Sequence, residues 1–283
     1  MIITKKILFP TDFSQVAENA FIYALSLAEQ TRAEIQVVHV VPVFEPEDNN
    51  VQIHPFMKTA NLELERSELK NFEKKQERLK QVVTALNKEH LHLEYVFLKG
   101  NLQDVIFDLA ESQRIDMIIM GTSGANTIDK KLFGSNTINI INNVDIPVMA
   151  IPAKAKFTSI SNYSTAVMLE PGELSAIRKI ASYLSIMGLP MNCVNVVSSS
   201  KEATLCEEKK QNWLKDVNCP NVTVDIVFNE DIDKGLLEYT RDNEIDLLGI
   251  LHRNLPMAKR FFTPNHSKLL LKYSGIALLV YNI

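Results

Sequence analysis

The sequence predicts an α/β fold in which one parallel-sheet domain occurs twice. Short apolar segments with the composition of buried strands alternate along the chain with segments of helical spacing, which is typical of a parallel sheet with helices on both faces. The chain has 283 residues, enough for two domains of about 140 residues. Its two parts also repeat, because adding 130 to each number carries Leu98–Ile151 onto Phe228–Tyr281 without a gap. A repeat of this length indicates duplication of one domain.

The expected strands of the first copy are short and apolar. They lie at residues 7–9, 35–41, 91–98, 117–120 and 146–151. The helices between them each keep one apolar face, and they are expected over 17–28, 61–89, 102–110 and 135–141. Thr11, Asp12 and Ser14 are all residues that cap the start of a helix. Residues 42–58 contain three prolines and are expected to be irregular, either as a lid over a site or as a plain surface loop.

The second copy follows a polar, unpatterned segment, 153–163, which is the expected linker. Strands are expected at 166–169, 194–197, 222–228 and 276–281, with a helix over 174–184. We therefore expect one domain over residues 1–152 and a second over residues 160–283.

Three of the nine glycines in the chain follow the strand at 117–120. Gly121, Gly124, Gly134 and Ser135 form the pattern Gly-x2-Gly-x9-Gly-Ser. Glycine lets the backbone approach a ligand closely, and the free N–H groups at a helix start attract an anion. Ser135 adds a hydroxyl donor where a helix is expected to begin. The pattern indicates a phosphate-binding loop, and the alternative is a flexible surface loop that happens to hold three glycines.

This glycine spacing, followed by a helix and a strand ending in Ile-Pro, resembles the nucleotide-binding members of the universal stress protein family. The opening segment Lys6–Ser14 is similar to that family's first strand and acidic turn. The resemblance covers both copies, but its site motif is intact only in the first. It implies an open sheet of five parallel strands in the order 3-2-1-4-5 in each copy, of the adenine nucleotide alpha hydrolase-like type. It also implies ATP or AMP as the ligand, with Mg²⁺ as a further candidate.

The resemblance assigns positions around the nucleotide. Asp12 is expected on the adenosine side, and Val40 is expected to meet the adenine edge through its backbone. The residues of the glycine pattern are expected to surround the phosphates, while Met120 either packs nearby or belongs to the core. The candidate cofactor-binding residues are Pro10, Asp12, Val40, Met120, Gly121, Ser123, Gly124, Gly134, Ser135 and Asn136. No catalytic residue and no metal ligand is assigned.

The second copy has lost the glycine pattern. The register of 130 replaces the three glycines and the serine with Leu251, Asn254, Pro264 and Asn265. Leu251 brings a side chain to where a phosphate needs bare backbone, and Pro264 has no N–H to donate. Near the acidic turn, Glu170-Pro171-Gly172 is expected to replace Pro10-Thr11-Asp12. The basic loop His252–His266 is either an anion or metal site or a polar surface loop, and we favour the second because two histidines alone are a small ligand set.

Composition excludes several function classes. A formal net charge of −4 argues against a nucleic-acid surface. No apolar run approaches the roughly 18 residues that would indicate a membrane span, and no signal peptide is apparent. The three cysteines, Cys193, Cys206 and Cys219, form no CxxC pair. These features are typical of reduced thiols in a cytoplasmic protein.

Three functions are compatible with the sequence. The first is an adenine-nucleotide-binding module of the stress response that acts through its conformation or through a homodimer or protein partner. The second is a slow ATPase or phosphotransferase, with Asp12 holding Mg²⁺ through phosphate and Lys130 or Lys131 reaching the γ-phosphate. The third is an interaction scaffold that binds no nucleotide. Dehydrogenase and P-loop functions are excluded because neither G-x-G-x-x-G nor G-x-x-x-x-G-K-[ST] occurs.

Overall fold

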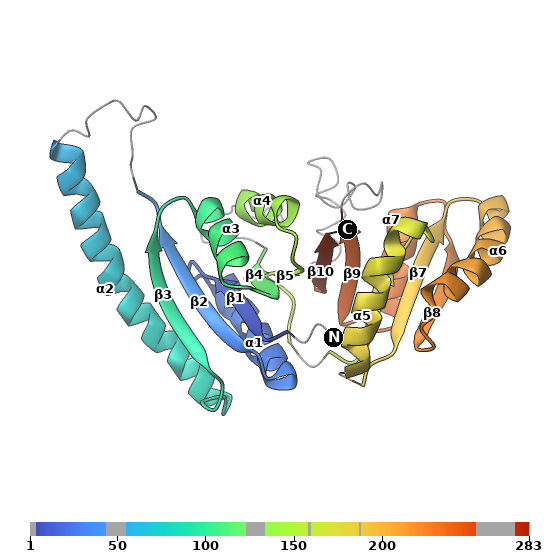
Figure 1. Ribbon diagram of the computed structural model, residues 1–283, viewed down its shortest axis with the longest axis horizontal. Helices are drawn as coiled ribbons and strands as arrows, with labels where there is room; N and C mark the ends of the chain where they lie inside the picture. Colours follow the sequence, from blue (N-terminus) through green and yellow to red (C-terminus); the bar gives the residue numbers. More distant parts are fainter. Residues whose placement is uncertain are drawn as a thin grey trace.

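In the computed structural model, the described residues are 4–43, 55–122, 134–157, 160–186, 188–252 and 275–282. Their strands form one ten-stranded sheet, in the order β3-β2-β1-β4-β5-β10-β9-β6-β7-β8, with helices packed on it (Figure 1). We call the strands β1–β5 and their helices the first half, and the strands β6–β10 and their helices the second half.

Each half contains the predicted sheet. The strands of the first half are β1 Lys6–Pro10, β2 Glu34–Val41, β3 Leu93–Lys99, β4 Met117–Gly121 and β5 Val148–Ile151. All of their pairings are parallel and their order is 3-2-1-4-5, which confirms the prediction. The strands of the second half are β6 Tyr163–Ala166, β7 Met191–Val197, β8 Val222–Phe228, β9 Leu247–His252 and β10 Ala277–Asn282. They keep the same relative order, so the fold occurs twice.

The two halves join through their last strands. β10 pairs antiparallel with β5, with Leu278 opposite Ala150 and Val280 opposite Val148. Since every pairing within a half is parallel, the carboxyl ends of the strands in the two halves face opposite edges of the sheet at this junction. A site at the carboxyl edge of one half therefore lies next to the amino edge of the other half.

Helices cover both faces of the sheet. Their bounds are α1 Gln15–Thr31, α2 Pro55–Ala85, α3 Leu102–Ser112, α4 Ser135–Asn143, α5 Leu174–Ile186, α6 Ser200–Val217 and α7 Ile232–Asp242, with a 3₁₀ turn η1 at Pro171–Glu173. Successive strand residues point to opposite faces. Accordingly Phe9 belongs to a buried cluster with α1, α2, α5 and α6, whereas Leu8 belongs to a second cluster with α3, α4 and α7.

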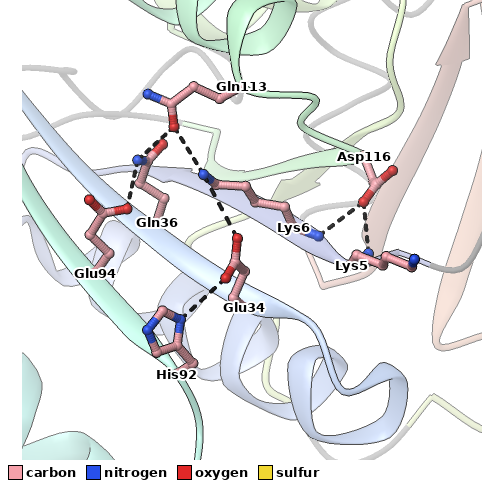
Figure 2. A network of polar contacts seen from close by, with 8 residues as sticks. All are labelled: Lys5, Lys6, Glu34, Gln36, His92, Glu94, Gln113 and Asp116. Carbon is pink, nitrogen blue, oxygen red and sulfur yellow. Dashed lines mark hydrogen bonds and ion pairs between the residues drawn. The ribbon is translucent and has the colours of Figure 1, made fainter.

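The repeat extends to individual contacts. Adding 130 to the bounds of α3 gives the bounds of α7. At the amino edge of the first half, Asp116 accepts hydrogen bonds from the backbone N–H groups of Lys5 and Lys6, at 2.7 and 3.0 Å (Figure 2). Asp246 accepts from Ser161 and Asn162 in the same way, at 2.9 and 3.0 Å. Each aspartate holds the segment that enters the first strand of its half.

The polar network around Asp116 supports the sheet on the side away from the predicted nucleotide site. Gln36 Nε2 donates to Glu94 and to Gln113, both at 2.9 Å, and Lys6 Nζ also donates to Gln113. Figure 2 shows these side chains converging from β1, β2, β3 and the segment that precedes β4. Because this network lies at the amino ends of the strands, its role is to stabilise the sheet.

We expect Asp116→Ala and Asp246→Ala each to lower the free energy of unfolding by about 2 kcal/mol, because two backbone N–H groups lose a charged acceptor in each case. Urea denaturation of the full chain measures the effect. Asp108→Ala, at an exposed position of α3, is the matched control and should change stability little. Unchanged stability in both entry-segment variants would contradict the structural role of these aspartates.

Two predicted elements need correction. The helix predicted over 61–89 is α2, which runs from Pro55 to Ala85. Proline is well tolerated in the first turn of a helix, so the predicted irregular segment ends sooner than expected. After Ala85, Asn87 takes a φ of 55° and the Lys88 N–H donates to the Val83 carbonyl at 2.9 Å, which is a left-handed helix ending.

The strand predicted at 166–169 is β6, Tyr163–Ala166. The pattern of apolar residues misplaced it because Ser164 and Thr165 are polar but completely buried. Thr165 Oγ1 satisfies its hydrogen bond by donating to Tyr163 Oη at 2.6 Å. The predicted linker, 153–163, therefore overlaps the start of the strand.

Candidate functional site

The acidic turn after β1 is held by its own side chains. The Thr11 N–H donates to the Val38 carbonyl of β2 at 2.9 Å, which fixes the end of β1. Thr11 Oγ1 accepts from the Phe13 N–H, and Asp12 Oδ1 accepts from the Ser14 N–H, both at 2.9 Å. Ser14 then caps α1 by accepting from the Ala17 N–H. The turn leaves the Asp12 side chain exposed at the carboxyl edge of β1.

His39 orients the same turn, although no motif in the sequence marks this histidine. Its Nδ1 lies 2.8 Å from the Thr11 carbonyl oxygen. Because a carbonyl oxygen only accepts, this contact assigns a proton to Nδ1. The imidazole ring also stacks on Phe72 of α2, with centroids 6.1 Å apart and an angle of 13° between the planes. β2 and α2 thus fix the carbonyl that precedes Asp12.

The end of β4 and the start of α4 form a tight junction. The Gly134 N–H donates to the Thr122 carbonyl at 2.6 Å, and Thr137 Oγ1 donates to the carbonyls of Gly121 and Thr122 at 3.2 and 3.4 Å. Gly134 is the N-cap residue of α4, and it supplies no side-chain hydrogen bond to the first turn. Ser135 and Asn136, the first two residues of the helix, are exposed. The helix therefore starts without a side-chain acceptor at its N-cap.

Gly121 lets α1 lie against the end of β4. A Cβ at this position would lie 2.9 Å from Val16 Cγ1 and 3.3 Å from the Val16 carbonyl carbon and oxygen. Since Val16 is in the first turn of α1, this contact brings the acidic turn beside the β4–α4 junction. Gly121 is thus required for helix packing, a reason that the glycine pattern alone did not provide.

The other candidate residues divide into three groups. Pro10 and Met120 are buried, and Met120 belongs to the core beneath the site. Val40 is half-buried near the carboxyl end of β2 and packs on the face of α3 and α4. The next residue, Val41, points to the other face and helps to line a cavity of about 340 Å³ with Pro42, Leu62 and Lys99. Ser123 and Gly124 lie outside the described residues, as do Lys130, Lys131 and most of the His252–His266 loop.

The second half differs from the first at the acidic turn. The pairing of β6 with β7 follows the pairing of β1 with β2 at an offset of 156, because Leu8 faces Gln36 and Ser164 faces Asn192. At this offset Asp12 corresponds to Met168, so the predicted replacement by Gly172 is wrong. Phe13 and Leu169, which correspond, both have a φ of 59°, which supports the corrected alignment.

Two contacts show how the second half holds its turn without the acid. Asn195, at the position of His39, donates from Nδ2 to the Val167 carbonyl at 2.8 Å. The buried carboxyl group of Glu173 accepts from the N–H groups of Met168 and Glu170, at 2.8 and 2.9 Å. Burial raises the pKa of Glu173, while these two N–H groups oppose the shift. The carboxyl group of Glu173, in η1, thus closes the turn, and the apolar Met168 stands where Asp12 stands in the first half.

Within the described ranges, no three His, Cys, Asp or Glu side chains gather in a group that could hold a metal ion. In the same part of the chain, no helix is both long enough and apolar enough to cross a membrane.

Known proteins resemble this chain both in sequence and in fold. The model of the universal stress protein family matches residues 4–152. Universal stress protein MJ0531 of Methanocaldococcus jannaschii is 30% identical over 155 residues, which are 54% of this chain and 84% of that protein. Universal stress protein MJ0577 of the same organism is 28% identical over 156 residues, which are 53% of this chain and 96% of that protein.

A crystal structure of a universal stress protein from Archaeoglobus fulgidus covers 99% of this chain, and the match includes 99% of that chain. The TM-score is 0.69 and the sequence identity is 17%. At this identity the likeness shows the fold alone, but it extends over both halves.

Proposed function

This chain belongs to the universal stress protein family, and on that basis we propose that its first half binds an adenine nucleotide, ATP or AMP. We further propose that residues 1–152 form the nucleotide-binding domain and residues 160–283 an altered second domain. The protein acts in the stress response as a nucleotide-dependent regulatory or interaction module, through a homodimer or another protein partner. A cytoplasmic location is part of the proposal, supported by three free cysteines.

The observation that carries the proposal is the place where α4 begins. The helix starts at the carboxyl end of β4 with no side-chain cap, and its first-turn N–H groups carry the partial positive charge that favours an anion. The contact of Val16 with Gly121 brings the acidic turn to the same crevice. In a parallel sheet, ligands bind at such a crevice, where the strand order reverses between β1 and β4.

The proposed nucleotide spans this crevice. Its phosphates lie at Gly121, Gly124, Gly134, Ser135 and Asn136, with Ser123 in the same loop. Asp12 lies on the adenosine side, and the adenine lies by Val40 and the adjoining cavity. Pro10 and Met120 support the site from below, since both are buried.

Nucleotide released by denaturing the purified protein, identified by mass spectrometry, tests the proposal directly. Calorimetric titration with ATP and AMP then gives the stoichiometry, for which we expect one nucleotide per chain. Two equivalent sites per chain would contradict the assignment of the site to the first half alone. A protein that neither carries nor binds adenine nucleotide would support the scaffold hypothesis.

We expect ATP turnover far below the typical enzymatic rate of ~10 s⁻¹. Backbone N–H groups stabilise bound triphosphate and transition state alike, and equal binding of both does not accelerate the reaction. Single-turnover assays with Mg²⁺ measure the rate in the wild type and in the Lys130→Ala/Lys131→Ala double variant. Rapid hydrolysis that the double variant loses would make the protein an ATPase and overturn this expectation.

A further inference from the structure

A cavity of about 500 Å³ lies between the two halves, within the ~300–1,000 Å³ range of ligand pockets. One wall is α5 of the second half, with the end of β10 beside it. The opposite wall is the amino edge of the first half, before β4 and β5. Its lining residues that matter here are Thr4, Ser175, Lys179, Tyr183, Tyr281 and Asn282. The proposed nucleotide site is at the other edge of the first half, so this cavity is separate from it.

The corresponding place on the other side of the junction is filled by the chain itself. There, α1 takes the position of α5, and residues 152–157 lie against it after β5. Asn19 Nδ2 donates to the Ala155 carbonyl at 2.6 Å, and Ala155 is only 1% exposed. The Phe157 ring packs edge-on against Tyr23, with centroids 4.9 Å apart and planes at 83°. A segment that turns at residues 152–155, where the Ala155 N–H donates to the Pro152 carbonyl at 3.0 Å, and that carries one aromatic side chain thus closes this side.

The two places are related by the duplication. The offset of 156 carries Asn19 and Tyr23 onto Ser175 and Lys179, which are exposed in the cavity wall. On each side of the junction, a tyrosine of the helix also interacts electrostatically with an aspartate of the other half. Burial and then the charge of Asp246 raise the pKa of Tyr23 to about 12, and burial and the charge of Asp116 raise the pKa of Tyr183. Each helix faces the aspartate that precedes a strand of the other half.

Two side chains that line the cavity have buried oxygen atoms without hydrogen-bond partners among the described residues. Asn282 Nδ2 donates to the carbonyls of Ile141 and Val144, which fixes the orientation of the amide. Its Oδ1 is buried and has no hydrogen-bond partner among the described residues. Tyr183 Oη lies beside Thr4, but it too is buried without hydrogen-bond geometry to any described residue. Neither oxygen is exposed to the cavity, so the polar groups that a ligand can reach are those of the exposed side chains of Ser175 and Lys179.

We propose that this cavity binds a short, turn-forming peptide segment of a partner protein, which inserts one aromatic side chain between α5 and the first half. Carbonyl groups of the segment accept hydrogen bonds from Ser175 and Lys179, whose side chains are exposed in the cavity wall. Residues 152–157 supply the pattern for this segment, because they perform the same function against α1. Tyr23 is replaced here by Lys179, whose ammonium group suits the face of an aromatic ring.

The test uses the full chain and a fluorescein-labelled, amidated hexapeptide with the sequence of residues 152–157, Pro-Ala-Lys-Ala-Lys-Phe. A second peptide with alanine in place of the phenylalanine is the control probe. Fluorescence anisotropy should show that the phenylalanine peptide binds at least tenfold more tightly than the alanine peptide. No binding of the phenylalanine peptide at millimolar protein, or equal binding of both peptides, would overturn the proposal.

Two matched variants locate the binding. Ser175→Trp fills the cavity from α5 and should weaken peptide binding at least tenfold. Ser185→Trp, exposed on the same helix but outside the cavity lining, should leave it unchanged. Excess ATP should not displace the peptide, so failure here is distinguishable from failure of the nucleotide proposal. Displacement by ATP, or binding that survives Ser175→Trp, would place the peptide elsewhere and refute the inference.

Discussion

Replacing Asp12 with methionine should weaken ATP binding at least tenfold, which corresponds to about 1.4 kcal/mol. The second half already carries Met168 at this position, and its turn keeps the same backbone form, with Leu169 at the φ of Phe13. The variant loses the hydrogen bond from the Ser14 N–H to Asp12 Oδ1, which costs about 1 kcal/mol of stability. The fold should therefore survive while the adenosine side loses its polar group.

Calorimetric titration of the two proteins with ATP measures this difference. Asp12→Asn is the first control, since the amide oxygen still accepts from the Ser14 N–H and preserves the turn. Met168→Ala in the second half is the second control and should leave ATP affinity unchanged. If Asp12→Met bound ATP as tightly as the wild type, the acidic turn would have no part in the site.

Gly121→Leu should lower the free energy of unfolding by about 3 kcal/mol, at the upper end of overpacking effects. The new Cβ alone would lie 2.9 Å from Val16 Cγ1, and a valine in a helix has little freedom to rotate away. Either α1 moves from the sheet or the leucine does, and both outcomes disturb the acidic turn. ATP binding should be lost together with stability.

The second half suggests a partial rescue of this variant. At the corresponding positions it has Leu251 on the strand, which is 2% exposed, and Gly172 before the helix. A Cβ at Gly172 would meet nothing within 4 Å, so the expected rescue rests on the first half, where Val16 Cγ1 is the atom nearest to a Cβ at Gly121. We expect Val16→Gly/Gly121→Leu to be more stable than Gly121→Leu alone, with a coupling energy of about 1–3 kcal/mol. Urea denaturation of the wild type, the two single variants and the double variant measures this coupling energy. Independent effects of the two substitutions would argue against direct packing of Val16 on Gly121.

The spacing of apolar residues was sufficient to predict the elements whose buried side chains are apolar. The strand at Met117–Gly121 and the helix from Ser135 were found because their buried positions are occupied by isoleucine and methionine. β6 was misplaced because its buried residues include Ser164 and Thr165. Thr165 donates a hydrogen bond to Tyr163 inside the protein, and a hydrophobic pattern does not register buried polar side chains of this kind.

The alignment of the acidic turns failed for a different reason. The offset between the halves is 156 in the first two strands and 130 from α3 onward, so the second half is 26 residues shorter between these points. Much of the difference is in α2, which has 31 residues where α6 has 18. The register of 130 therefore does not extend to the acidic turn, and the predicted replacement by Glu170-Pro171-Gly172 used an offset of 160, four residues more than the strand pairing gives.

Contacts across elements account for the site residues that the sequence did not predict. His39 forms a hydrogen bond with the Thr11 carbonyl, 28 positions away. Val16, in α1, leaves no room for a side chain at Gly121 on the face of the sheet. Neither residue type carries a local signal for such a role. The positions of Ser135 and Asn136 at the start of α4, in contrast, follow from the glycine before them.

The antiparallel pairing of β5 with β10 has a consequence for concentration dependence. Two separate domains that paired through these strands would dissociate on dilution, whereas domains on one chain meet at an effective concentration that short connections place in the millimolar range. The pairing in this chain is therefore independent of how much protein the cell makes. The half that we propose to bind nucleotide and the half that lacks the acidic turn are always present in equal amounts and always adjacent. Any change that nucleotide binding causes at the edge of β5 would therefore reach β10 whether the chain is scarce or abundant.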